Sequence, residues 1–208
     1  MDSTKIVKAL AELRKEKERK FDQTIDLIIN LKNIDMRKES VSLFVPVPHK
    51  IKEVKVAGIF EKKSDLVDDT ITATTLESLK DVKEIKKIAA QFDFFMANAK
   101  LMPKVASVLG RYLGPMGKMP SPQLGIVPPG EDAASIKDVK DKIDKSVKVK
   151  PKEPSIKVAI GKSSMKDEEI VANINAVEAG VIKALPRGKE NIRNILIKFT
   201  MTKPIKVD

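Results

Sequence analysis

The first part of the chain begins with a helical pattern and continues with two strand patterns. Apolar residues at helical spacing predict a helix over residues 3–20 (Ile6, Leu10 and Leu13), the second half of which is almost entirely charged. Apolar and polar residues then alternate over 21–31 and again over 41–47. This alternation predicts two strands, each with one buried face.

The middle of the chain alternates strand patterns with helix patterns. Residues 52–60 and 92–99 predict strands, and residues 75–92 and 100–113 predict helices. Such alternation is typical of a parallel α/β layer. The polar, lysine-rich and proline-bounded segment 126–154 predicts a small helix followed by a linker.

The C-terminal part returns to strong patterns. A strand is predicted over 155–162, a helix over 163–185 with an apolar stripe, and a last strand over 191–207. Ser164 and Asp167 have the spacing of a capping box at the start of that helix.

Neither end of the chain can bury its apolar faces alone, so we predict that the two ends fold together. The fold class is α+β and α/β. A split-βαβ (ferredoxin-like) domain, with a four-stranded sheet covered by two helices, is formed by residues 1–58 plus 155–208. Residues 59–154 form an inserted, Rossmann-like three-layer α/β domain.

Charge adds a functional indication. The formal net charge is +11, of which the predicted outer domain carries +8 (23 Lys and Arg, 15 Asp and Glu) and the insert +3 (17 and 14). A basic excess of this kind favours a polyanionic partner such as nucleic acid, although charge also serves solubility. There is no cysteine, which excludes disulfides and thiolate chemistry. With no signal-peptide pattern and no long apolar run, we expect a cytoplasmic protein that does not bind a membrane.

Two incomplete nucleotide-binding motifs argue against an enzyme. The phosphate-binding loop requires G-x-x-x-x-G-K-[ST]. Gly117-Lys118 is followed by Met119, and Gly161-Lys162-Ser163 has Ile156 where the first glycine belongs. The only histidine is His49, so a catalytic triad or histidine metal cluster has no partners. We therefore predict no catalytic residues, no metal and no cofactor.

Four stretches in order resemble the ribosomal protein L1 family. They are LGRYLGPMGKMPSP (109–122), KFDQT (20–24), VAIGKSSM (158–165) and FTMTKP (199–204). The resemblance covers essentially the whole chain, and PVPHK (46–50) with the short C-terminus resembles the archaeal branch. One departure is Thr202, where the family usually has a glycine. That difference puts the loop conformation in doubt and could add a hydroxyl contact.

The resemblance implies a structural protein of the large ribosomal subunit. It implies binding to the rRNA of the mobile stalk, assistance to the movement and release of exit-site tRNA, and repression of its own mRNA. It implies a monomer when free of the ribosome.

The resemblance also implies the RNA-binding residues: Lys20, Phe21, Thr24, Gly161, Lys162, Ser163, Thr200, Met201, Thr202 and Lys203. Small hydroxyl side chains suit the 2′-hydroxyls of folded RNA, and the lysines suit phosphates. Arg111 and Lys118 are predicted as secondary RNA or interdomain residues. Gly110 and Gly114 are predicted to permit close packing or left-handed turns.

Several alternatives remain open on sequence alone. Phe21 and Met201 fit apolar strand patterns and could belong to the core, and Lys20 could simply be solvated. Residues 137–152 favour a solvated helix and linker over a second RNA site. The rival functions are a nucleotide-dependent enzyme that uses the α/β insert and the IGKSS turn, and a protein-interaction module whose charge serves solubility.

Overall fold

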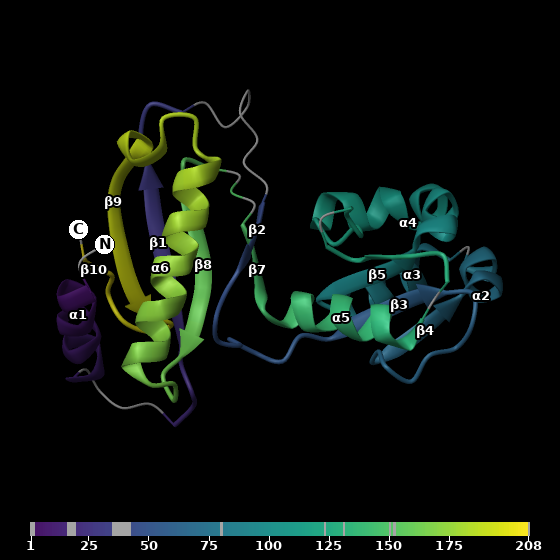
Figure 1. Ribbon diagram of the computed structural model, residues 1–208, viewed down its shortest axis with the longest axis horizontal. Coiled ribbons are helices and arrows are strands. Elements are labelled where there is room, and N and C mark those ends of the chain that lie inside the picture. Colours follow the sequence, from purple (N-terminus) through teal and green to yellow (C-terminus); the bar gives the residue numbers. More distant parts are fainter. Residues whose placement is uncertain are drawn as a thin grey trace. The chain divides into compact units, whose positions relative to one another are not determined.

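The chain divides into two compact units. The computed structural model describes residues 3–15, 20–34, 43–79, 81–122, 124–130, 132–149, 151 and 153–207. The outer unit comprises Met1–Lys52 with Lys145–Asp208, and the inserted unit comprises Glu53–Asp144 (Figure 1). Both boundaries come earlier in the chain than the positions predicted after residues 58 and 154.

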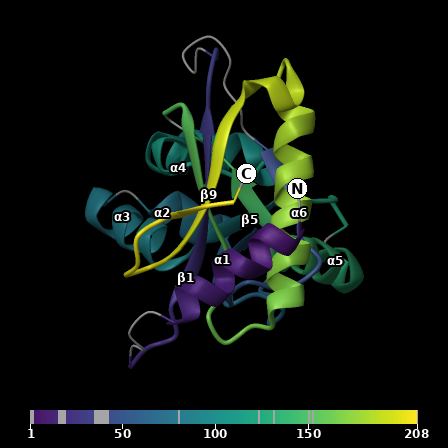
Figure 2. The same ribbon diagram turned by 90° about the vertical axis from the view of Figure 1, so that its left-hand side faces the viewer.

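A four-stranded sheet forms the centre of the outer unit. Its order is β10-β9-β1-β8, and every neighbouring pair is antiparallel. The strands are β1 (Thr24–Leu31), β8 (Ser155–Lys162), β9 (Ile192–Phe199) and β10 (Ile205–Lys206). Helices α1 (Ser3–Lys15) and α6 (Asp167–Ala184) share one core with the sheet and so cover the same face (Figures 1 and 2).

The alternating pattern of β1 explains this layering. Ile25, Leu27, Ile29 and Leu31 are buried in the core, while the residues between them are half-buried on the other face. On the helical side, Ile6, Leu10 and Leu13 of α1 are buried as their spacing predicts. Burying each Leu or Ile contributes about 1.5–3 kcal/mol, which fixes the register because a slip by one residue would turn the apolar set to solvent.

The membership of the sheet differs from the prediction. The described part of segment 41–47 contains β2 (Leu43–Pro46), which pairs with β7 (Ser146–Val149) in a separate two-stranded sheet. A strand thus occupies part of the segment predicted as helix and linker. β2 packs on α6, where Gly180 leaves room: an added Cβ would lie 2.8 Å from both Val45 methyl carbons.

The predicted last strand is also two strands. β9 and β10 are antiparallel neighbours joined by residues 200–204, so the predicted strand over 191–207 is interrupted by a turn. This turn carries the FTMTKP motif. Ser164 is outside α6, which begins at Asp167 with Lys166 as its N-cap. The predicted Ser164–Asp167 capping box is therefore wrong.

The inserted unit contains a parallel sheet of order β4-β3-β5-β6. Its strands are β3 (Val56–Phe60), β4 (Asp69–Thr72), β5 (Phe94–Asn98) and β6 (Ile126–Val127). Every residue of β3 is buried, as expected for a central parallel strand covered on both faces. The helices are α2 (Ala73–Ser78), α3 (Val82–Gln91), α4 (Met102–Met116) and α5 (Ala133–Asp144), with 3₁₀ turns η1 (Ala99–Leu101) here and η2 (Gly188–Asn191) in the outer unit.

The glycine-rich stretch 109–122 ends α4. The helix continues to Met116, and Gly117 closes it in the left-handed region at φ 67°, donating its N–H to the Leu113 and Gly114 carbonyls. This position requires glycine. Gly110 and Gly114 are helical, and apart from their chain neighbours and the backbone of their own helix no heavy atom lies within 4 Å of a Cβ added at either position. The roles predicted for these two glycines are wrong.

Candidate nucleic-acid interface

Three segments that are far apart in sequence meet at one end of the outer sheet. Thr24 pairs with Lys162 across the β1–β8 register, and the Thr200 N–H donates to the Thr24 carbonyl at 3.0 Å. The Ser163 N–H donates to the Gln23 carbonyl at 2.8 Å. We call residues 20–24, 161–164 and 200–203 the strand-end cluster. It contains all ten primary residues that the sequence indicated.

The Thr24–Thr200 contact is reinforced by a side chain. The Thr200 hydroxyl accepts from the Thr24 N–H at 3.1 Å and donates to the Thr24 carbonyl at 3.2 Å. It therefore helps to join β1 to the turn after β9 and keeps one further lone pair for an outside donor. The Thr24 hydroxyl makes no hydrogen bond within the described part of the chain.

The turn after β9 is held by two polar side chains. Gln23 is buried, and its Oε1 accepts from the Met201 N–H at 3.3 Å. The Thr202 hydroxyl accepts from the Phe199 N–H at 2.9 Å and donates to the Phe199 carbonyl at 3.4 Å. Thr202 is not among the residues with positive φ. Threonine therefore stabilises this turn without needing a glycine conformation.

Two large apolar side chains of the cluster face solvent. Phe21 is 53% exposed and Met201 is 57% exposed, so the alternative that they belong to the core is wrong. Lys20 and Lys203 are exposed beside them in sequence. An exposed aromatic ring and an exposed thioether, with lysines nearby in sequence, offer stacking surface and charge, the combination used by proteins that bind unpaired RNA bases and phosphates.

The carboxylate of Asp22 organises the turn between β8 and α6. It accepts from the Ser163 hydroxyl at 2.7 Å, from the Ser164 N–H at 3.1 Å and from the Ser164 hydroxyl at 2.9 Å. Lys162 Nζ lies 3.9 Å from the second carboxylate oxygen. The Ser163 hydrogen bond is the main cause that holds the pKa of Asp22 below its ordinary value; burial opposes it, and the Ser164 donors and Lys162 act in the same lowering direction.

Arg14 fixes the same turn from α1. Its guanidinium donates to the Ser163 carbonyl at 2.9 Å, to the Met165 carbonyl at 3.0 Å, and through two nitrogens to Asp167 Oδ1 at 2.7 and 3.1 Å. A planar guanidinium is suited to such multiple contacts. The sequence alone did not indicate a role in this site for Arg14, Asp22, Gln23 or Ser164. The quoted motifs contained three of them, but no pattern showed which side chains turn inward.

Of the remaining predicted residues, Gly161 and Lys118 contact other parts of the protein itself, and Arg111 is exposed. Gly161 is buried, and an added Cβ would lie 3.3 Å from Met165 Sδ, so this glycine makes room for the turn. Lys118 donates to the carbonyls of Ala89 and Phe92 at 2.8 and 2.7 Å, which ties its ammonium to the inserted unit. Arg111 is an exposed residue of α4.

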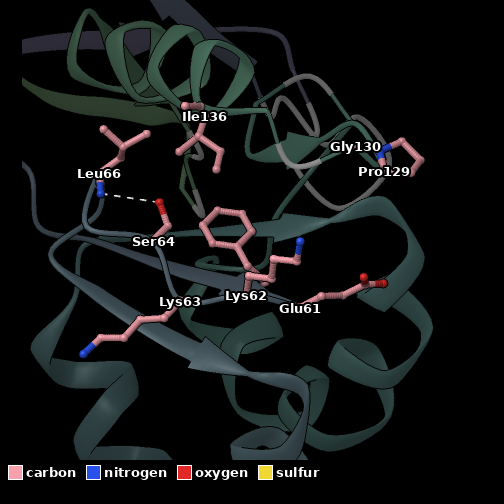
Figure 3. A pocket seen from close by; sticks show the side chains of 10 residues that line it. Glu61, Lys62, Lys63, Ser64, Leu66, Pro129, Gly130 and Ile136 are labelled. Carbon is pink, nitrogen blue, oxygen red and sulfur yellow. Dashed lines mark hydrogen bonds between the residues drawn. The ribbon is translucent and has the colours of Figure 1, made fainter.

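The inserted unit contains a cavity at the place where open α/β sheets bind ligands. It measures about 290 Å³ and lies past the carboxyl ends of β3 and β6. Figure 3 shows the lining side chains, among which Lys63 extends away from the cavity. Its described lining residues include Glu61, Lys62 and Lys63, and Gly130 is the single glycine among them, so they do not form a glycine-rich phosphate loop. The cavity therefore gives little support to the hypothesis that the protein is a nucleotide-dependent enzyme.

Two further properties of the described residues concern other classes of protein. No group of three or more His, Cys, Asp or Glu side chains among them could hold a metal ion. Within the same residues, no helix is both long enough and apolar enough to cross a membrane.

The fold and this site define a mixed α/β protein whose chain ends build one basic, partly apolar surface. Comparison with known proteins identifies the family. Residues 13–203 match the model of the ribosomal protein L1p/L10e family, so the chain belongs to that family. The family is one of structural ribosomal proteins, and the chain is a component of the large ribosomal subunit and not an enzyme.

Archaeal relatives match over nearly their whole length. The chain is 36% identical to the large ribosomal subunit protein uL1 of Pyrococcus horikoshii, with 100% of this chain and 97% of the relative covered. It is 35% identical to the uL1 protein of Nanoarchaeum equitans, with 97% and 98% covered. It is 38% identical to that of Pyrobaculum calidifontis, with 94% and 89% covered.

Proposed function

We propose that the strand-end cluster binds large-subunit rRNA. The observation that carries this proposal is the convergence of Lys20–Thr24, Gly161–Ser164 and Thr200–Lys203 on one end of the sheet, with Phe21 and Met201 exposed. The exposure of these two large apolar side chains to water is unfavourable in free energy in the free protein. A partner that covers them compensates for that cost.

The chemistry of the cluster matches folded RNA better than duplex DNA. Hydroxyl and backbone groups can pair with 2′-hydroxyls, the phenyl ring of Phe21 can stack on a base or sugar, and Lys20 and Lys203 can neutralise phosphates. The free Thr24 hydroxyl and the remaining lone pair on Thr200 Oγ1 are the groups we assign to 2′-hydroxyl recognition.

The finer function follows the family resemblance. We infer that the rRNA target is the mobile stalk, that the protein assists the movement and release of exit-site tRNA, that it represses translation of its own mRNA, and that it is a monomer when free. The outer unit serves as the split-βαβ RNA-binding domain and the inserted unit as a Rossmann-like domain. Arg111 is a secondary RNA or interdomain residue.

Filter binding of the full chain to a stalk rRNA fragment tests the proposal. The fragment should bind far more tightly than an unrelated RNA duplex, and Phe21→Ala or Met201→Ala should weaken only the binding of the fragment. We expect about a tenfold loss for Phe21→Ala, since stacking of an aromatic side chain on one base is worth about 1–3 kcal/mol, and a smaller loss for Met201→Ala, which has no ring. Equal affinity for both RNAs would reject specific recognition.

The same filter-binding assay tests the roles assigned to the Thr24 and Thr200 hydroxyls. Thr200→Val should weaken rRNA binding, because it removes the lone pair and also the side-chain link to Thr24. Thr24→Val removes a hydroxyl without breaking a hydrogen bond of the described residues. A loss of affinity in Thr24→Val therefore reports recognition of RNA and not a change in the turn.

A further inference from the structure

The turn between β8 and α6 presents a set of donors that suits an oxyanion. Ser163 and Ser164 contribute two hydroxyls, Ser164 adds a backbone N–H, and Lys162 adds an ammonium group. Hydroxyls, backbone N–H groups and a lysine are the groups with which proteins hold phosphates. We call residues 162–164 the donor turn.

In the free protein the anion in this turn is the carboxylate of Asp22. The carboxylate takes three hydrogen bonds of 2.7–3.1 Å, shared between its two oxygens. The next residue, Gln23, holds Asp22 in place. The Ser163 N–H donates to the Gln23 carbonyl at 2.8 Å, and the Gln23 N–H donates to the Ser163 hydroxyl at 3.0 Å. The lowered pKa of Asp22 agrees with a carboxylate that its surroundings stabilise in the charged form.

The donor turn and the Asp22 carboxylate lie within the proposed RNA-binding surface, so they affect RNA binding. Phe21 precedes Asp22 directly, and Lys162 and Ser163 belong to the strand-end cluster. A phosphate gripped by the donor turn would add affinity for any RNA, because phosphate contacts are independent of sequence. A carboxylate in the turn removes that contact and repels a phosphate that approaches.

We propose that the donor turn is an oxyanion site and that Asp22 closes it to RNA phosphates, which makes Asp22 a specificity-determining residue. This inference rests on the proposed RNA-binding function. The role of Asp22 is to lower the affinity for unrelated RNA, so that base stacking and 2′-hydroxyl contacts decide which RNA is bound.

The test compares the full wild-type chain with two variants that each remove one negative charge. Asp22→Asn loses the charge, and its neutral amide oxygen is a weaker acceptor that a phosphate can displace from the Ser163 and Ser164 donors. Glu168→Gln is the matched control, because Glu168 is an exposed residue of the first turn of α6 and has no hydrogen bond or ion pair with the donor turn among the described residues. Asp22→Ser is a second neutral variant for the case in which thermal unfolding shows that Asp22→Asn does not fold.

The first measurement is binding of a stalk rRNA fragment and of an unrelated RNA duplex over a range of salt concentrations. In Asp22→Asn we expect the duplex to bind about tenfold more tightly, with a salt slope steeper by about 0.9, the value for one added phosphate contact. Glu168→Gln should change duplex affinity by less than about twofold, because Glu168 is exposed and salt screens the effect of an exposed charge. Equal duplex affinity or equal salt slope in the two variants would overturn the proposal.

The second measurement uses inorganic phosphate and no RNA. NMR titration should shift the Ser163 and Ser164 amide signals in Asp22→Asn and leave them in place in the wild-type protein. The proposal is wrong if these signals move equally in both proteins, or in neither. Because this arm needs no RNA, its outcome stands apart from the proposed function, which fails if wild-type protein does not prefer the rRNA fragment.

Discussion

At the residue scale, the site depends on which side chains turn inward and which remain exposed. Phe21 and Met201 are exposed, whereas Gln23 is buried although it is polar. The sequence placed all three in the right region through motifs. It could not give their directions, because these follow from hydrogen bonds across more than a hundred residues, such as that between the Met201 N–H and Gln23.

Arg14 illustrates a residue that acts through others. Arg14→Ala should weaken rRNA binding about five- to tenfold, because the donor turn loses the guanidinium that holds the Ser163 and Met165 carbonyls. The salt slope should stay the same, since no phosphate contact is removed. Lys15→Ala, which deletes the neighbouring exposed charge, should change affinity by less than about twofold. Equal losses in both variants would assign Arg14 only a long-range charge effect.

Asp26 gives a prediction about stability and pH. Burial raises the pKa of Asp26 above its ordinary value, and Lys198 opposes this. The neutral acid is therefore favoured in the folded state, and its contribution to stability is complete below the unfolded-state pKa and lost as pH rises through the folded-state pKa. Asp26→Asn should be more stable than wild type at pH 7 in urea unfolding, by no more than about 1 kcal/mol because the group is partly solvated.

A control separates this effect from a simple reduction of charge. Glu168→Gln removes a carboxylate that interacts favourably with the start of α6, so it should lower stability slightly at pH 7. The advantage of Asp26→Asn should disappear near pH 3. A variant that is less stable than wild type at pH 7 would show that the Lys198 interaction outweighs burial.

At the element scale, long patterned segments were predictable and short ones were not. β1, β8 and α6 follow alternation or a helical stripe. The structure has β8 at the predicted bounds, whereas β1 begins at Thr24 and not at 21, and α6 begins at Asp167 and not at 163. β6 and β10 have two residues each, too few for a period to be recognised. Their strand conformation comes from pairing with β5 and β9, which is information that a local pattern does not contain.

The pairing of β2 shows a second limit. Its alternation predicted a strand, but the same alternation would fit the four-stranded sheet or any other partner. The partner β7 lies in a lysine-rich segment that resembles a linker. Packing determines where β2 lies, because the Val45 side chain packs against Gly180 of α6, where any side chain would collide with it.

The end of α4 offers a matched pair of glycine substitutions. Gly117→Ala should destabilise the protein by about 1 kcal/mol, because Gly117 is left-handed at φ 67°. Gly110→Ala should stabilise it by about 0.5–1 kcal/mol, because the residue is helical and its Cβ would meet no atom. Thermal unfolding of both variants measures the difference, and effects of the same sign would contradict the assigned roles.

At the scale of the whole molecule, the proposed RNA binding depends on the two ends of the chain forming one surface. The family resemblance gave the ten primary residues, and the structure brings their segments together through backbone hydrogen bonds among Gln23, Thr24, Ser163 and Thr200. The excess positive charge of the predicted outer domain is consistent with a polyanionic partner for this surface. The inserted unit has its own sheet and cavity, and the large apolar side chains exposed among its described residues are Leu66, Val82 and Met116.

The most direct measurement is amide hydrogen exchange of the full chain with and without a stalk rRNA fragment. We expect bound RNA to slow exchange in peptides covering residues 20–24, 161–165 and 200–204 together, with little change in Glu53–Asp144. Protection confined to the inserted unit, or protection of only one of the three segments, would contradict the claim that these segments form a single RNA-binding surface.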